Sequence, residues 1–150
     1  MQISEFSPKH SGGKSNNLRI LQSKISSDIK LPESVVIPFR VFEHVLNLNP
    51  IAKKSLEAII NKIPASSSSS KKMNKLLDDC KNIVQNLTFD DQDKHLKFLK
   101  QGLEEFGVTD FESAWLTIKK VWASKFNERA LLATKKIDVS LNQIFMAVLV

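Results

Sequence analysis

The chain has 150 residues, of which 42% are hydrophobic and 25% are charged, with four glycines and five prolines. A chain of this length and composition can bury a core of its own, which excludes collagen-like, disulfide-rich and wholly disordered proteins. No apolar run approaches the roughly 18 residues that a membrane helix needs. The opening residues, MQISEFSPKH, lack the apolar block of a signal peptide. The sequence therefore indicates neither membrane insertion nor secretion.

The 22 Lys and Arg residues exceed the 16 Asp and Glu residues and give a formal net charge of +6. This charge suits an anionic partner but does not choose between nucleotide, nucleic acid and other polyanions. Cys80 is the only cysteine, which excludes an internal disulfide and a cysteine-based zinc site. His10, His44 and His95 lack metal-ligand spacing, so the sequence predicts no metal site.

The N-terminal part predicts helices and one short strand. Leu18, Leu21 and Ile25 have helical spacing after the flexible pair Gly12-Gly13 and predict an amphipathic helix. Residues 31–38 are rich in β-branched side chains and bracketed by prolines, which predicts a buried strand. Two helices should follow, the first ending near Asn49-Pro50. Their apolar stripes are Val41, Phe42, Val45 and Leu46, and then Leu56, Ile59, Ile60 and Ile63.

Residues 65–72 include five consecutive serines and predict a flexible linker with no apolar face to bury. Apolar residues at helical spacing then predict helices over 73–87 and 96–103, packed as a hairpin. Asp90-Asp91 can cap the second of these helices.

Thr109 and Glu112 have the spacing of a capping box and predict the start of a long helix. Trp115 and Trp122 lie seven residues apart on its apolar face, which favours core packing over stacking on a sugar. Glu128-Arg129 is interpreted as an ion pair at a helix end, with an active-site pair as the alternative. Three lysines of this segment lie largely off the apolar face: Lys119, Lys120 and Lys125. Lys119 and Lys120 should be exposed to solvent.

Residues 144–150 are apolar almost throughout and predict a central strand. The elements together predict an α/β (α+β) fold, helix-rich with a small sheet that contains the strands near Val35 and Phe145. Because no cap or turn follows the last strand, we expect the chain to be cut within its domain. We also expect exposed apolar surface there and self-association into a homo-oligomer.

Gly12-Gly13-Lys14-Ser15 has the composition of a phosphate-binding loop. The full P-loop spacing is excluded, because its first glycine falls on Pro8, which has no amide, and no apolar strand precedes it. What remains is a flexible loop that places a lysine at the start of a helix, where amides and the helix dipole can hold an anion. A plain surface turn is the alternative.

The segment from Phe6 to Leu18, FSPKHSGGKSNNL, resembles the start of the nucleotide-binding domain of the pyruvate phosphate dikinase and phosphoenolpyruvate synthase superfamily. The segment from Ala114 to Ala130, AWLTIKKVWASKFNERA, is similar to the tryptophan-rich helix of the α-glucan, water dikinase branch. Phe126 stands where the plant enzymes usually have Trp. Residues 145–150 are similar to the strand that follows. The resemblance covers nearly the whole chain and is weakest between 49 and 107.

The resemblance implies that residues 1–150 are the N-terminal part of an ATP-grasp-like domain. It implies that Lys14 contacts ATP phosphate and that Gly12 and Gly13 let the loop close over it. It also implies that backbone near the C-terminal end approaches the adenine: Ala147, Val148 and Val150. In the family, the arginine-serine phosphate-binding segment, the Mg2+ ligands and the phosphorylated histidine lie beyond the point that matches Val150. No catalytic or metal-binding residue is therefore expected in this chain.

The implied parent enzyme transfers the β-phosphate of ATP to its own histidine and then to a glucosyl unit of a starch-like α-glucan, and the γ-phosphate to water. We expect this chain to contribute ATP binding and to be inactive alone, with ATP and Mg2+ as cofactors and no membrane partner. Plastid and cytoplasm both remain open as compartments. The alternative function is a basic helical interaction or nucleic-acid-binding module, which the +6 charge suits. No zinc spacing or recognition helix supports that alternative.

Overall fold

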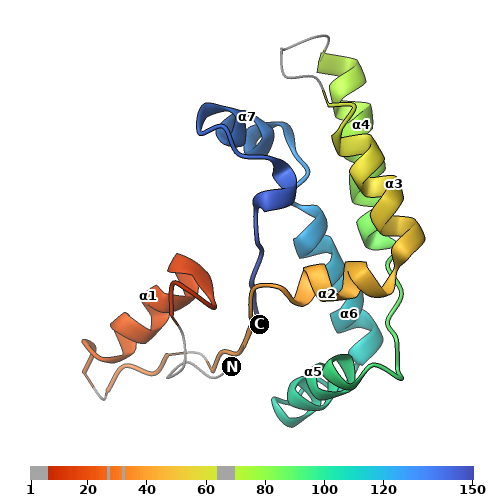
Figure 1. Cartoon of the computed structure of the whole chain (residues 1–150). Coiled ribbons are helices and arrows are strands. Elements are labelled where there is room, and N and C mark those ends of the chain that lie inside the picture. The colour runs from red at the N-terminus through yellow and green to blue at the C-terminus, as the bar shows by residue number, and fades with distance from the viewer. Residues whose placement is uncertain (1–6, 27, 32, 64–69) are drawn as a thin grey trace. The chain divides into compact units, whose positions relative to one another are not determined.

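The structure is a computed structural model that describes residues 7–63 and 70–150, apart from Ser27 and Pro32. The chain divides into two compact units. Unit 1 comprises Met1–Phe42 and Met146–Val150, and unit 2 comprises Glu43–Phe145. The described residues form seven α-helices, a short 3-10 helix and two short strands (Figure 1). The predicted helix-rich fold with a small sheet is therefore confirmed at this level.

Unit 1 contains helix α1 (Gly12–Gln22) and an antiparallel ribbon of strands β1 (Val36–Ile37) and β2 (Val148–Leu149). The prediction that these two distant segments share one sheet is confirmed. The register places Val36 opposite Leu149 and Ile37 opposite Val148, and Val35 and Val150 exchange backbone hydrogen bonds of 3.0 and 2.8 Å.

Both strands are shorter than the sequence predicts. The apolar run 144–150 contributes only its last part to a strand, so the expectation of a central strand over its whole length is wrong. In the described part of the chain β2 pairs with β1 alone. The polar turn before the run explains part of the difference, because Ser140 and Gln143 form a capping box around the 3-10 helix η2 (Leu141–Gln143).

Helix α1 differs from the prediction at both ends. The glycine pair does not precede the helix as a loop but forms its first turn. The helix ends at Gln22, before Ile25, and the Ser23 hydroxyl donates to the Ile20 carbonyl as the helix stops. The predicted apolar stripe is wrong as well, because the buried residues of α1 are Ser15 and Asn16, whereas Leu21 is 44% exposed.

Most of the remaining helices lie in unit 2, which α2 enters at its third residue. The helices are α2 (Val41–Leu48), α3 (Pro50–Ile60), α4 (Ser70–Gln85), α5 (Lys94–Glu105), α6 (Phe111–Ala123) and α7 (Glu128–Lys136). The predicted break at Asn49-Pro50 is confirmed, and the proline becomes the first residue of α3. Residues 65–69 of the predicted linker lie outside the described residues, and its last three, 70–72, are helical. None of the described helices is both long and apolar enough to cross a bilayer.

The helix caps of unit 2 differ from those predicted. Asp93, and not Asp90-Asp91, caps α5, and its Oδ1 accepts from the amides of His95 and Leu96 at 3.0 and 2.9 Å. Asp110, and not Thr109, caps α6 by accepting from the amide of Ser113 at 3.0 Å. An N-cap oxygen must reach amides two or three residues ahead, and only the residue immediately before the first turn does so.

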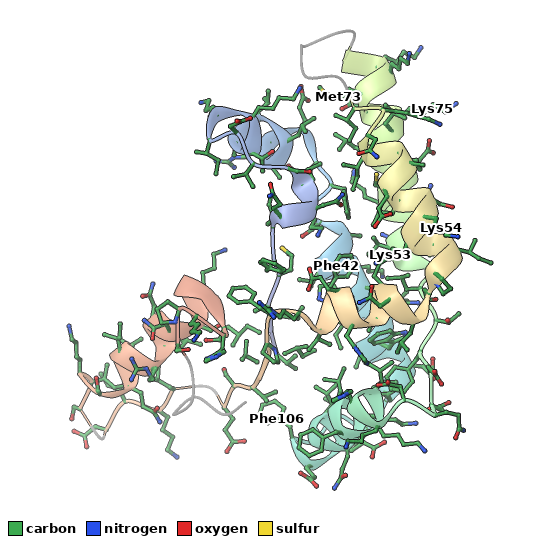
Figure 2. The ribbon with its side chains drawn as sticks, in the orientation of Figure 1. Phe42, Lys53, Lys54, Met73, Lys75 and Phe106 are labelled. Carbon is green, nitrogen blue, oxygen red and sulfur yellow. The ribbon has the colours of Figure 1, made fainter. Side chains whose placement is uncertain are left out.

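The core of unit 2 lies along α4, which packs against both α3 and α6, while α5 packs against α6. The expected hairpin of 73–87 with 96–103 is therefore wrong, because the helices packed against α4 are α3 and α6. Figure 1 shows α3 and α4 side by side. Met73 of α4 is buried, whereas Lys54 of α3 and Lys75 of α4 point outward from this helix pair (Figure 2). Gly107 follows α5 at φ +102, as the predicted helix break.

Trp115 and Trp122 are buried, which confirms their prediction as core residues. Their rings meet edge to face at 5.5 Å, and Phe89 contacts Trp115 at 5.1 Å and Phe111 at 4.8 Å in the same way. Edge-to-face packing is a favoured arrangement of aromatic rings and adds to the burial of their apolar surface.

Gly12 and Gly13 offer a matched pair for testing α1. A side chain at Gly12 would be strained by φ +81 and would bring its Cβ within 3.2 Å of the Phe39 ring, whereas a Cβ at Gly13 meets nothing within 4 Å. We expect Gly12→Ala to destabilise unit 1 by about 1–2 kcal/mol. We expect Gly13→Ala to leave stability unchanged or raise it by up to about 1 kcal/mol. Urea unfolding followed by circular dichroism, with amide exchange of α1, measures both, and equal effects of the two substitutions would contradict the strained turn.

Candidate functional site

The N-terminus of α1 has the chemistry of an anion site. Its N-cap residue, Ser11, makes no side-chain cap. The Ser11 hydroxyl instead donates to the Ser7 carbonyl at 2.8 Å and accepts from the Ser7 amide at 2.9 Å. The first turn contains no acidic residue, and Lys14 is exposed at its third position. Amides without a side-chain cap, the positive end of the helix dipole and an exposed lysine therefore coincide here.

The segment that follows β1 holds this helix start in place. The Phe39 amide donates to the carbonyl of His10 at 2.9 Å, and the Phe39 ring lies against Gly12. The Ser7 hydroxyl lies 3.0 Å from Nδ1 of His10. The turn before α1 is thus fixed on two sides, by its own serines and by Phe39.

The pairing of β1 with β2 determines which backbone amides and carbonyls of the C-terminal segment are free to bind a ligand. Val150 exchanges both of its polar backbone groups with Val35. Hydrogen-bonded and non-hydrogen-bonded pairs alternate along an antiparallel ribbon, so the groups of Val148 also point toward β1. The same alternation turns the groups of Leu149 toward the opposite edge. Leu149 was missed by sequence reasoning, because its orientation depends on a register that the sequence does not reveal.

Every residue predicted for the nucleotide site lies in unit 1. The glycines and Lys14 form the start of α1, and Ala147, Val148 and Val150 lie in or beside β2. The short stretch 35–39 links the two groups, because its first residues pair with the β2 segment and Phe39 holds the turn before α1. The structure therefore attaches both predicted parts of the site to one stretch of chain.

Lys125 is buried, in contrast to its predicted place off the apolar face. It lies in the turn after α6 with 5% of its surface exposed, and its Nζ donates to the carbonyl of Ile144 at 3.2 Å. Burial lowers the pKa of Lys125 to about 8, and the Glu43 carboxylate opposes this shift. Both carboxylate oxygens of Glu43 are buried and accept no hydrogen bond from a described residue.

Lys119 is also less exposed than predicted. Its Nζ donates to the carbonyl of Leu87 at 3.1 Å and lies 6.0 Å from the centre of the Trp115 ring. Burial lowers the pKa of Lys119, and Glu112 opposes the shift. Lys120 is exposed, as predicted.

His44 and Asp93 join α2 to the start of α5. Nε2 of His44 lies 2.9 Å from Oδ1 of Asp93. The hydrogen bond from His44 and the capped amides of Leu96 and His95 lower the pKa of Asp93. Among the residues that the structure describes, no three His, Cys, Asp or Glu side chains form a group suited to a metal ion. We read the His44–Asp93 contact as a structural link between helices.

Cys80 is a buried core residue. Burial, and secondarily the charge of Asp79, raises the pKa of its thiol to about 11. The thiolate that would react is therefore scarce at neutral pH.

Two open hollows of unit 2 are lined by residues that the structure describes. One of about 540 Å³ lies along the start of α3 and the end of α4 and is lined by Leu48, Asn49, Pro50, Ile51, Ala52, Ser55, Asn82, Ile83 and Asn86. The other lies at the start of α7 and is lined partly by Glu128 and Arg129, which are exposed. The described structure contains no ion pair between these two residues. Neither hollow contains a residue predicted for nucleotide binding.

The buried charge of Lys125 predicts a pH dependence of stability. The folded protein releases the Lys125 proton at about pH 8, whereas the unfolded chain keeps it up to the ordinary value of 10.5. The unfolded state binds more protons in this window, so the free energy of unfolding should rise with pH. Wild type should gain up to about 1.4 kcal/mol per pH unit relative to Lys125→Met.

Urea unfolding between pH 8 and 10 measures this slope. Lys120→Met, which removes an exposed lysine of the same segment, should keep the wild-type slope. Identical slopes in wild type and Lys125→Met would contradict the depressed pKa.

No protein-family model matches the chain, and no solved structure shows a significant match. Curated relatives do match. The chain is 36% identical to alpha-glucan water dikinase, chloroplastic, of Solanum tuberosum, over 97% of this chain and 10% of that protein. It is 34% identical to the protein of the same name from Citrus reticulata, over 97% of this chain and 10% of that protein. It is also 34% identical to alpha-glucan water dikinase 1, chloroplastic, of Arabidopsis thaliana, over 97% and 11% respectively.

The chain thus spans about a tenth of the length of these relatives. The similarity extends through both units, since 97% of the chain is matched in each case. The resemblance predicted from the sequence is confirmed, and this chain is a homologue of one segment of the alpha-glucan water dikinases.

Proposed function

We propose that unit 1 binds ATP for an alpha-glucan water dikinase reaction, with the phosphates at the N-terminus of α1. The observation that carries the proposal is the start of α1 without a side-chain cap and with Lys14 exposed, in a chain homologous to dikinases over 97% of its length. A dikinase must hold a polyphosphate, and a helix N-terminus with a lysine is a suitable anion site.

We assign each residue of the first turn of α1 a separate role in phosphate binding. The amides of Gly13 and Lys14 donate to phosphate oxygens, and the Lys14 ammonium neutralises their charge. Gly13 leaves open space where a side chain would stand, so the phosphates can approach the backbone. Gly12 supplies the positive φ that starts the helix. As the phosphoryl group leaves, Lys14 stabilises the charge that develops on it.

The outer edge of β2 meets the adenine. Leu149 turns its backbone groups away from β1, where they can pair with the edge of a purine ring. Ala147, just before β2, lies beside this edge. The half-exposed side chains of Leu149 and Val150 offer apolar contact for its faces. The sequence predicted adenine contacts from the backbone of Val148 and Val150. We propose instead that the polar contacts come from Leu149, in the same short segment.

The names of the relatives support a dikinase reaction for the whole enzyme. We propose transfer of phosphate from ATP through a phosphohistidine to an α-glucan, with the second phosphate going to water. Mg2+ accompanies the ATP, and the described residues offer no ligand group that would hold it. The chain contributes ATP binding as part of an ATP-grasp-like domain and does not turn over alone. The word chloroplastic in the three relatives' names favours the plastid over the cytoplasm.

Removing the Lys14 charge tests the phosphate site. Because a hydrogen bond to a charged group contributes about 1.5–3 kcal/mol, Lys14→Ala should weaken ATP binding about 10- to 100-fold. Lys24→Ala removes an exposed lysine just beyond the other end of α1 and should leave the affinity unchanged. Lys14→Arg should restore little, since a guanidinium differs in shape and reach from an ammonium. Calorimetric titration with ATP and Mg2+ measures all three, and equal losses for Lys14→Ala and Lys24→Ala would contradict the assignment.

The same titrations separate ATP binding from nucleic-acid binding. Salt-dependent binding of random-sequence DNA in the absence of ATP binding would support the alternative function. In a full-length dikinase, autophosphorylation from β-labelled ATP should fall in Lys14→Ala while glucan binding is kept.

Two proline substitutions test the adenine edge. Leu149→Pro removes an amide that points away from β1 and should preserve the ribbon while it weakens ATP binding about tenfold, the effect of losing about 1.4 kcal/mol. Val150→Pro removes the amide that donates to the Val35 carbonyl at 2.8 Å and should disrupt the ribbon itself. Amide exchange of Val35 and Ile37, whose amides face β2, reports the ribbon, and calorimetry reports ATP binding. Wild-type affinity in Leu149→Pro would contradict the placement of the adenine.

A further inference from the structure

Lys125 lies where the two chain ends of unit 2 come together. Glu43 is the first residue of unit 2, and Ile144 is the last but one. The Lys125 ammonium donates to the carbonyl of Ile144 at 3.2 Å, and its charge interacts with the carboxylate of Glu43. One buried cation therefore serves both points at which the chain enters and leaves this unit.

The two charges depend on each other. The Glu43 carboxylate is removed from water and accepts no hydrogen bond from a described residue, so a nearby cation is needed to offset its burial. Lys125 is itself buried, and its ammonium lies 5.2 Å from the centre of the Phe126 ring. Two buried opposite charges are often no more stabilising than apolar residues of similar size. Their better-attested effect is to specify one arrangement of the chain.

We propose that Lys125 is a positioning residue that clamps both chain ends of unit 2 and thereby fixes the root of the segment that continues into β2. Ile144 precedes Val148, the first residue of β2, by four residues. The proposal rests on the proposed function in one respect, because only ATP binding at β2 gives this segment a ligand to position. A purely structural lysine would stabilise unit 2 without any selective effect on residues 145–150.

The test uses this 150-residue chain with Lys125→Met, Glu43→Gln and the double substitution, and with Lys120→Met as the exposed-lysine control. Three quantities are measured: the urea midpoint of unit 2 from tryptophan fluorescence, native-state amide exchange of α4 and of residues 145–150, and the dissociation constant of ATP with Mg2+. Exchange of 145–150 is read at the amides of Val148 and Val150, which face β1. Lys125→Met should lower the midpoint and speed exchange of 145–150 about tenfold more than that of α4, the ratio expected from one lost charged hydrogen bond.

The double substitution separates positioning from stability. Glu43→Gln removes the carboxylate charge that Lys125→Met leaves uncompensated, so the double variant should recover most of the lost midpoint. It should not recover slow exchange at 145–150, because the Ile144 carbonyl still lacks its donor. ATP affinity should follow the exchange and not the midpoint. Lys125→Arg, which keeps a cation, should restore part of the exchange protection.

The outcomes decide between the two roles. Exchange at 145–150 that changes only in proportion to α4 would overturn the proposal, as would full recovery of slow exchange in the double variant. If wild type fails to bind ATP, the proposed function fails, and the exchange data still judge the clamp on their own.

Discussion

The pair of backbone hydrogen bonds between Val35 and Val150 is the constraint on which the candidate site depends. It joins segments from opposite ends of the sequence, and the strands β1 and β2 extend from it in a register that follows directly. The same stretch continues to Phe39, which holds the turn before α1 through the His10 carbonyl. Without this pairing, no described contact would link Lys14 at the start of α1 to the backbone proposed to bind adenine.

Local periodic signals predicted much of the fold. The apolar stripes of α2, α3, α4 and α6 appear where expected, and the tryptophan pair is buried, because helical spacing and large apolar side chains act within a few turns of chain. The sequence did not predict which of several neighbouring residues caps or ends a helix. Asp93 caps α5 although Asp90-Asp91 looked equally suitable, and the α1 stripe failed because the helix stops at Gln22. The strand lengths were also missed, since an apolar run does not reveal how many of its residues find a partner strand.

The sequence predicted part of the candidate site, as it predicted part of the fold. The glycine pair and Lys14 carry a local motif, and the structure places them at a helix start that suits an anion. The orientation of Leu149 depends on pairing with residues more than a hundred positions away, which no local pattern contains. The burial of Lys125 has the same origin, because Glu43 and Ile144 become its neighbours only after the whole of unit 2 has folded. Sequence reasoning therefore found the residues with a motif and missed those defined by long-range contacts.

The central claim, that ATP binds at the start of α1 and along the outer edge of β2, is tested most directly by amide NMR of the labelled chain. Titration with ATP and Mg2+ should shift the amide signals of Gly13, Lys14 and Leu149 most strongly, because these are the groups proposed to donate to the nucleotide. Residues of α7 line a separate hollow, and their amide chemical shifts should not change. Shifts confined to α7 or to the hollow beside α3, with those three amides unchanged at saturating ATP, would contradict the account.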